Sequence, residues 1–121
     1  MARFRLSRPA QADLTQMLAT SAVRWGIDGR RRYAAILAAA LRQLAVEPEG
    51  AATRDRSELP PGVRSLHLRH ARGPDPEATV RQPVHILYYR VVTPGLIEIH
   101  RMLHERMEPS RRAGAGPEDK D

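Results

Sequence analysis

Apolar positions near the start of the chain show a short alternation and then a helical period. Residues 4–7 alternate apolar and polar side chains before Pro9, which predicts a short first strand. Ser7 is a suitable N-cap for a helix over residues 8–25, and Gly26 offers that helix a left-handed stop. The apolar face of this helix recurs every three or four residues, at Ala10, Leu14, Met17, Leu18, Ser21 and Trp25.

A second amphipathic helix follows the glycine. Asp28 is a candidate N-cap, Pro48 ends the helix, and the apolar stripe comprises Tyr33, Ile36, Leu37, Ala40, Leu41 and Leu44. Two amphipathic helices joined by a turn of two or three residues predict an antiparallel hairpin in which each helix buries its stripe.

Three later segments are rich in β-branched and large apolar residues, and each predicts a strand: 63–70, 84–92 and 96–103. The tight-turn signal Thr93-Pro94-Gly95 makes the last two strands an antiparallel hairpin. Residues 49–62 are interpreted as a polar linker and residues 71–83, with three prolines, as an exposed loop.

The resulting fold class is α+β, with an N-terminal strand and an antiparallel helical hairpin packed on a small, mainly antiparallel β-sheet. The 121-residue chain has room for one domain, which we assign to residues 1–109, and the polar segment 110–121 is predicted to be a disordered tail.

Composition narrows the functional classes. The absence of cysteine excludes disulfides, thiolate nucleophiles and cysteine-ligated zinc. No segment has the roughly 20 apolar residues of a membrane-spanning helix, and residues 1–10 lack the apolar core of a signal peptide, so we expect a cytoplasmic protein. The formal net charge of +6 predicts attraction to polyanions or to an acidic protein partner.

The histidines give little support for a metal site or a cofactor. His100 and His104 lie in one predicted strand, roughly 13 Å apart at the rise of extended chain, which is too far for one ion. His67 and His70 fall on opposite faces of another predicted strand, so one is expected to be packed and the other solvated. We therefore predict no metal and no cofactor.

Two short segments are candidates for function. His104-Glu105-Arg106 places an acceptor, an acid and a cation in succession, which suits proton transfer on a phosphate ester or a charged binding surface. In the strand 84–92, alternation predicts that Leu87, Tyr89 and Val91 face the core and that Tyr88 is exposed beside Arg90. An exposed tyrosine next to an arginine is a candidate nucleic-acid contact.

The element order, together with several short sequence motifs, resembles the ParE branch of the ParE/RelE toxin superfamily over residues 3–109. The motifs are, in order along the chain, Arg5-Leu6-Ser7-Arg8-Pro9-Ala10, Asp13-Leu14, Arg24-Trp25-Gly26, Tyr33, residues 44–48, residues 59–66, Tyr89-Arg90-Val91 and residues 103–109. The most specific of them is the last, Leu103-His104-Glu105-Arg106-Met107-Glu108-Pro109.

The resemblance implies the toxin of a type II toxin–antitoxin module, neutralised by an acidic ParD-like antitoxin. The resemblance is compatible with two activities: inhibition of DNA gyrase, as in ParE-like members, or ribosome-dependent mRNA cleavage, as in RelE-like members. RelE-like nucleases carry a catalytic arginine at the position that aligns with Ile86, and His104 aligns with a histidine that some of them use. An apolar side chain cannot stabilise the transition state of phosphodiester cleavage, which favours a non-enzymatic toxin directed at gyrase.

On this interpretation the target-binding surface comprises Arg64, Arg90, Arg101, His104 and Arg106. The antitoxin is expected to lie on the outer rim of the helical hairpin or to add a strand at the edge of the last strand. One alternative is an mRNA endonuclease that uses His104, Glu105 and Arg106; another is an antitoxin-binding protein without toxicity.

Overall fold

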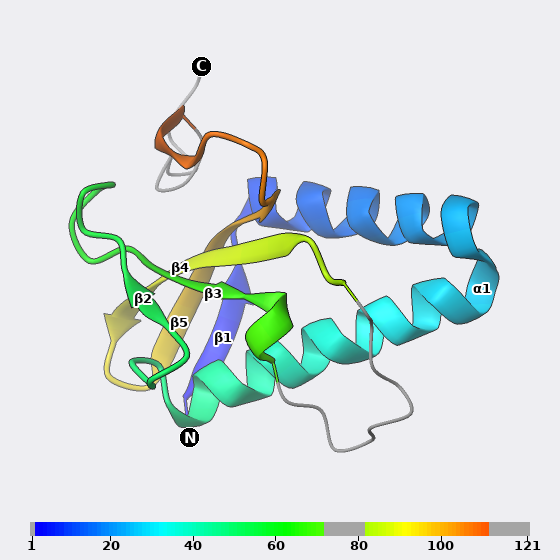
Figure 1. The fold of residues 1–121 in the computed structure, drawn as a ribbon. Helices are drawn as coiled ribbons and strands as arrows, with labels where there is room; N and C mark the ends of the chain where they lie inside the picture. Colours follow the sequence, from blue (N-terminus) through cyan, green and yellow to red (C-terminus); the bar gives the residue numbers. More distant parts are fainter. Residues whose placement is uncertain (1, 72–81, 112–121) are drawn as a thin grey trace.

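The computed structural model describes residues 2–71 and 82–111, which fold into two layers (Figure 1). One bent helix, α1 (Arg8–Val46), covers one face of a five-stranded sheet. The strands are β1 (Arg3–Leu6), β2 (Arg54–Asp55), β3 (Arg64–His67), β4 (His85–Thr93) and β5 (Leu96–His104), with short 3-10 helices η1 (Leu68–His70) and η3 (Pro109–Arg111). The α+β class predicted from the sequence is confirmed.

The helical hairpin forms within a single helix that is bent at one glycine. Ser7 caps it as predicted, because its Oγ accepts the backbone N–H of Ala10 at 3.1 Å. Gly26 has φ 76° and ψ −174°, a backbone conformation that is essentially restricted to glycine. The two arms of α1 meet at this residue, run back toward the sheet and diverge from one another in a V (Figure 1). The turn is therefore one residue, shorter than the predicted two or three.

The two arms bury their stripes unequally. In the second arm Tyr33, Ile36, Leu37, Ala40 and Leu44 are buried, as predicted. In the first arm Ala10, Met17 and Ser21 are buried, but Trp25 is 58% exposed, so its assignment to the buried stripe is wrong. Trp25 precedes the bend, which extends past the end of the sheet in Figure 1 and has no strand beneath it. No helix in the described ranges is long and apolar enough to cross a membrane.

The strand order is β1-β5-β4-β3-β2, and only the β1–β5 pair is parallel. The prediction of a mainly antiparallel sheet is thus confirmed, including the β4–β5 hairpin. Since β1 and β4 flank β5, the expectation that the last strand offers a free edge is wrong. The edge strands of the described sheet are β1 and β2.

The start of α1 continues the pairing of β5 where β1 ends. β1 pairs with β5 only as far as Ile99, whose carbonyl accepts the N–H of Ser7 at 3.0 Å. Ser7 Oγ then donates to the carbonyl of His100 at 2.7 Å. Asp13 accepts the N–H of Met102 at 2.9 Å and two bonds from the Arg101 guanidinium at 2.7 and 2.8 Å. These side chains fix the first turns of α1 on the sheet.

Apolar side chains pack on both faces of the sheet. The larger cluster lies between α1 and the sheet and includes Leu87 and Tyr89, with Val91 packed against it, as predicted. A smaller cluster on the opposite face comprises Leu59, Val63, Tyr88 and Leu103. Tyr88 is only 2% exposed, so its predicted exposure is wrong. The segment before β3 supplies Leu59 and Val63, which cover this tyrosine.

The expected linker and the strand after it differ from the sequence prediction. β2 lies inside the linker 49–62 and pairs with β3 through Arg54 and Ser65. β3 ends at His67, and the chain turns into η1, so His67 and His70 do not lie on opposite faces of one strand. Their ring centroids are 6.4 Å apart. His67 is nonetheless half-buried and His70 exposed.

Parts of the loop and the tail fall outside the described residues. The loop was assigned to residues 71–83, of which 72–81 are not described. The tail was assigned to residues 110–121; its first two residues belong to η3, and the remaining ten are not described.

The contacts of Asp13 predict a large loss of stability when its carboxylate is removed. Asp13→Ala leaves the largely buried Arg101 guanidinium and the Met102 N–H without their acceptor, which should lower the free energy of unfolding by about 2–3 kcal/mol. The matched control is Asp28→Ala in the same helix. The prediction that Asp28 is an N-cap is wrong, because Gly26 is the one non-helical residue in α1 and Asp28 lies inside the second arm. Its exposed pair with Arg31 at 4.0 Å should contribute about 0.5 kcal/mol or less. Urea unfolding of both variants measures the difference, and equal effects would refute this role of Asp13.

Candidate functional site

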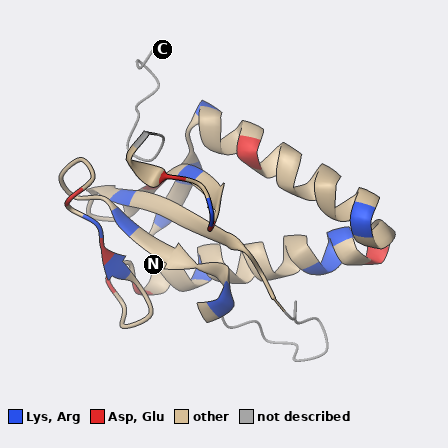
Figure 2. Ribbon diagram, turned by 45° about the horizontal axis from the view of Figure 1, so that its top comes forward, with Lys and Arg blue, Asp and Glu red and all other residues tan. Residues whose placement is uncertain are grey.

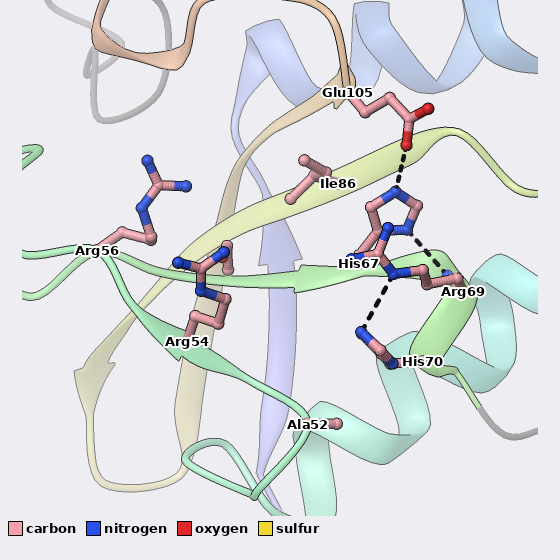
Figure 3. Close-up of a pocket in the computed structure, with 9 residues that line it drawn as sticks. Ala52, Arg54, Arg56, His67, Arg69, His70, Ile86 and Glu105 are labelled. Atoms are coloured by element: carbon pink, nitrogen blue, oxygen red, sulfur yellow. Dashed lines mark hydrogen bonds and ion pairs between the residues drawn. The ribbon is translucent and has the colours of Figure 1, made fainter.

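The sheet face turned away from α1 has a basic pocket of about 210 Å³ (Figure 3). Its lining is unusual in composition, with three arginines, two histidines and one carboxylate: Ala52, Arg54, Arg56, Ser65, His67, Arg69, His70, Ile86 and Glu105. Arg54 and Arg56 lie at one end, and His67, Arg69 and His70 lie at the other, beneath Glu105 (Figure 3).

Strand register brings these residues together. Arg54 pairs with Ser65, and His67 pairs with Ile86, so both pairs share one face of the sheet. The turn of η1 after β3 adds Arg69 and His70. Glu105 follows β5 and is held beside them because its N–H donates to the carbonyl of Val84 at 2.7 Å. The pocket thus draws on four strands or their ends.

His67 is fixed in one tautomer by two hydrogen bonds. Its Nδ1 accepts the backbone N–H of Arg69 at 3.0 Å, so the neutral ring carries its proton on Nε2 and donates it to Glu105 Oε1 at 2.7 Å. This hydrogen bond lowers the pKa of Glu105 and keeps the carboxylate ionised. With both nitrogens engaged, His67 has no free site from which to accept a substrate proton.

The pocket carries an excess of positive charge. Arg56 is paired with Glu58 at 2.6 Å and lies over the Tyr88 ring at 5.8 Å. Arg69 Nε is 3.3 Å from His70 Nε2. In the part of the chain that the structure describes, neither Arg54 nor Arg69 forms an ion pair with a carboxylate. The single acid in the lining is therefore outnumbered.

None of the five residues predicted to bind the target lines this pocket: Arg64, Arg90, Arg101, His104 and Arg106. Arg64 donates to Thr53 Oγ1 at 2.7 Å, while its buried Nε has no partner among the described atoms. Arg90 is exposed on β4, and its side chain passes close to Gly62. Arg101 is held by Asp13, so its guanidinium serves the fold.

The side chains of His104, Glu105 and Arg106 do not converge on one point. The His104 ring packs edge-on against His85 at 5.7 Å, and its Nδ1 accepts the N–H of Arg106 at 3.1 Å. Glu105 points into the pocket toward His67, and the Arg106 side chain is exposed. Ile86, at the position where the resemblance places a nuclease arginine, lies between the two basic ends of the pocket (Figure 3).

His85 lies in a separate buried cluster with α1. Its Nδ1 is 2.6 Å from the Tyr33 hydroxyl, which also accepts the N–H of Val84 at 3.2 Å. A neutral imidazole can accept a hydrogen bond from the tyrosine hydroxyl, whereas the charged form of His85 is disfavoured by burial and by the nearby His104. Burial lowers the pKa of His85 to about 4.

Residues 2–71 and 82–111 contain no group of three or more potential metal ligands. His100 Nε2 instead contacts Glu98 Oε1 at 3.0 Å, and His104 contacts His85. The two histidines considered for a metal site therefore have separate protein partners.

The basic lining of the pocket was missed in the sequence. Arg54 and Arg56 fall in the segment taken for a linker, and Arg69 and His70 follow the end of β3. The spacing of two between Arg54 and Arg56 was the available signal, because it places both side chains on one face of an extended segment.

Comparison of the sequence with known families and proteins gives consistent matches. Residues 4–109 match the family described as the ParE toxin of the type II toxin–antitoxin system parDE. Toxin ParE1 of Mycobacterium tuberculosis is 32% identical over 109 residues, which cover 90% of this chain and 95% of that protein. Toxin ParE1 of Caulobacter vibrioides is 32% identical over 115 residues, covering 94% and 100% respectively.

The fold also resembles a solved structure. A chain of the chromosomal ParDE system from P. aeruginosa superposes with a TM-score of 0.60 at 25% identity, covering 86% of this chain and 96% of that one. The similarity therefore extends over most of this chain and nearly all of the other.

The low pKa of His85 predicts a loss of stability in mild acid. Between about pH 6.5 and 4 the unfolded chain protonates this histidine and the folded chain does not, so the free energy of unfolding falls as pH is lowered through that window. Because the His85 side chain is partly exposed and solvent weakens the effect, the free energy of unfolding should fall by roughly 2 kcal/mol across this window.

Urea unfolding of the wild type and of His85→Gln, at about pH 7 and pH 4, isolates this effect from the titration of carboxylates. The difference in stability between the two proteins should shrink, or favour the variant, at the lower pH. A difference that does not change with pH would contradict the assignment.

Proposed function

Because the chain belongs to the ParE toxin family of type II toxin–antitoxin systems, we propose that it is neutralised by a ParD-like antitoxin and inhibits DNA gyrase when free. The observation that carries the proposal is the family match over residues 4–109, which runs from β1 through β5 to the start of η3. Action on gyrase implies that the toxin works in the cytoplasm.

Ile86 supports gyrase rather than mRNA as the target. Cleavage of a phosphodiester requires a cation beside the transition state and groups that exchange protons with it. Ile86 supplies no cation at the position where the resemblance places the nuclease arginine. The pocket has other arginines, but both nitrogens of its half-buried His67 are engaged by Arg69 and Glu105, so this histidine cannot exchange a proton with a substrate. Inhibition by binding requires no such groups.

Exposed cations on the sheet side form the proposed target surface. Arg90 on β4 and Arg106 after β5 are exposed, and His104 is half-buried with its ring against His85. Arg64 is half-buried across from Tyr89, on the sheet face that packs against α1, and it donates to Thr53 Oγ1, so we do not place it on this surface. We leave Arg101 out of the surface because Asp13 binds its guanidinium through two hydrogen bonds.

The tip of the helical hairpin is the proposed anchor for the antitoxin. Val23, Trp25 and Ile27 are 86%, 58% and 63% exposed, and they lie close together in sequence on the two sides of the bend at Gly26. A ParD-like antitoxin that presents an apolar segment would cover them. Arginines are also prominent at this bend (Figure 2), which suits an acidic partner.

Induction of the chain in bacterial cells tests the proposed activity. Without the antitoxin, growth should stop and the DNA-damage response should rise within the first generations, because gyrase inhibition leaves DNA breaks and altered supercoiling. Co-expression of a cognate ParD-like antitoxin should restore growth and provides the control. Arrest accompanied by cut mRNA and collapse of translation, without a damage response, would reject gyrase in favour of the ribosome.

Substitution of Trp25 tests the antitoxin surface. Trp25→Ala should weaken antitoxin binding by about 30-fold, the effect of losing an interface hot spot of roughly 2 kcal/mol. Val92→Ala removes an exposed apolar side chain from the sheet and should leave the affinity within about twofold. Calorimetric titration of the purified proteins gives both values. Wild-type affinity in Trp25→Ala would place the antitoxin elsewhere.

A further inference from the structure

Within the described residues, two cations of the sheet pocket form no close ion pair with a carboxylate, because Glu58 and Glu105, whose pKa values these arginines help to lower, are bonded to Arg56 and His67 instead. Arg54 and Arg69 lie at opposite ends of it, and neither forms an ion pair within the described residues. Like charges gathered in one concave site repel one another unless an anion joins them. The arrangement therefore favours a bound anion.

We propose that this pocket binds a backbone phosphate of a nucleic acid. The inference goes beyond inhibition of gyrase and does not rest on it, since it concerns what the isolated chain binds. A volume of about 210 Å³ is below the range of pockets that enclose a whole drug-sized ligand, and it suits one phosphate group with part of its sugar.

The geometry of the lining favours a phosphate over a carboxylate. Arg54 and Arg69 approach from opposite ends, and Ser65 adds a hydroxyl at the floor between β2 and β4. A tetrahedral phosphate has oxygens pointing in several directions, so it can accept from guanidiniums on different sides. A carboxylate has two oxygens in one plane and can satisfy one such fork at a time.

The same lining predicts binding without cleavage. Ile86 occupies the middle of the pocket, and the proton of His67 Nε2 is committed to Glu105. Glu105 is in turn kept ionised by that hydrogen bond, so it is a poor proton donor to a leaving group. A bound strand should therefore remain intact.

The test uses the purified full-length chain and a short fluorescent single-stranded oligonucleotide, in DNA and RNA forms, with binding followed by polarisation at several salt concentrations. Arg54→Ala and Arg69→Ala should each weaken binding about tenfold, the low end for a charge-assisted hydrogen bond, and should make the affinity less sensitive to salt. Inorganic pyrophosphate should compete with the oligonucleotide. If the two arginine substitutions weaken the binding of DNA and of RNA equally, the phosphate that both share is the ligand.

The matched control is Arg30→Ala, which removes the same charge from an exposed position on α1, away from the pocket. It should change the affinity by less than about twofold. An equal loss in Arg30→Ala would show diffuse attraction to a basic protein and overturn the proposal. So would pocket variants that bind the oligonucleotide like the wild type but have lost affinity for the antitoxin, since the ligand would then be a protein carboxylate. Gel analysis after incubation checks that the strand is uncut, and cleavage that depends on the pocket arginines would also overturn it.

Discussion

The attachment of the start of α1 to β5 is the interaction on which the rest of the structure depends. β5 lies inside the sheet, yet β1 covers its edge only as far as Ile99. Beyond that point Ser7 donates a hydrogen bond to the carbonyl of His100, and Asp13 accepts one from the N–H of Met102. Asp13 also neutralises the charge of Arg101. An unpaired stretch of strand would otherwise leave buried polar groups without partners. The same contacts hold α1 on one face of the sheet, and the pocket lies on the opposite face, which also carries the smaller cluster around Tyr88.

Much of the fold could be predicted because local signals agreed with the tertiary contacts. The cap at Ser7, the left-handed backbone of Gly26 and the turn at Gly95 are properties of single residues, and each occurs where the sequence places it. Tyr88 and the pocket could not be predicted in the same way. Tyr88 is buried by Leu59 and Val63 from a segment without regular periodicity, and the pocket arises from the register of β2 on β3. Both depend on which strands become neighbours, which alternation along one strand does not specify.

The two layers offer separate surfaces for separate partners. The bend of α1 extends past the sheet and presents apolar side chains, whereas the open face of the sheet presents cations around a pocket. We infer that the antitoxin is held mainly by the first surface and the target, with its nucleic acid, by the second. The +6 charge of the chain would favour both an acidic antitoxin and a polyanionic target. An antitoxin that spans from the bend to the sheet would then block the target's access to the sheet surface without having to mimic the shape of the target.

Inhibition of purified gyrase by the purified chain tests the central claim most directly. Relaxed plasmid DNA, gyrase and ATP are incubated with increasing amounts of the chain, and the DNA products are separated by topology on a gel. The account predicts that supercoiling falls as the chain is added and returns when the ParD-like antitoxin is supplied. Full supercoiling at a large excess of the chain, under conditions in which the same preparation still stops cell growth, would contradict it.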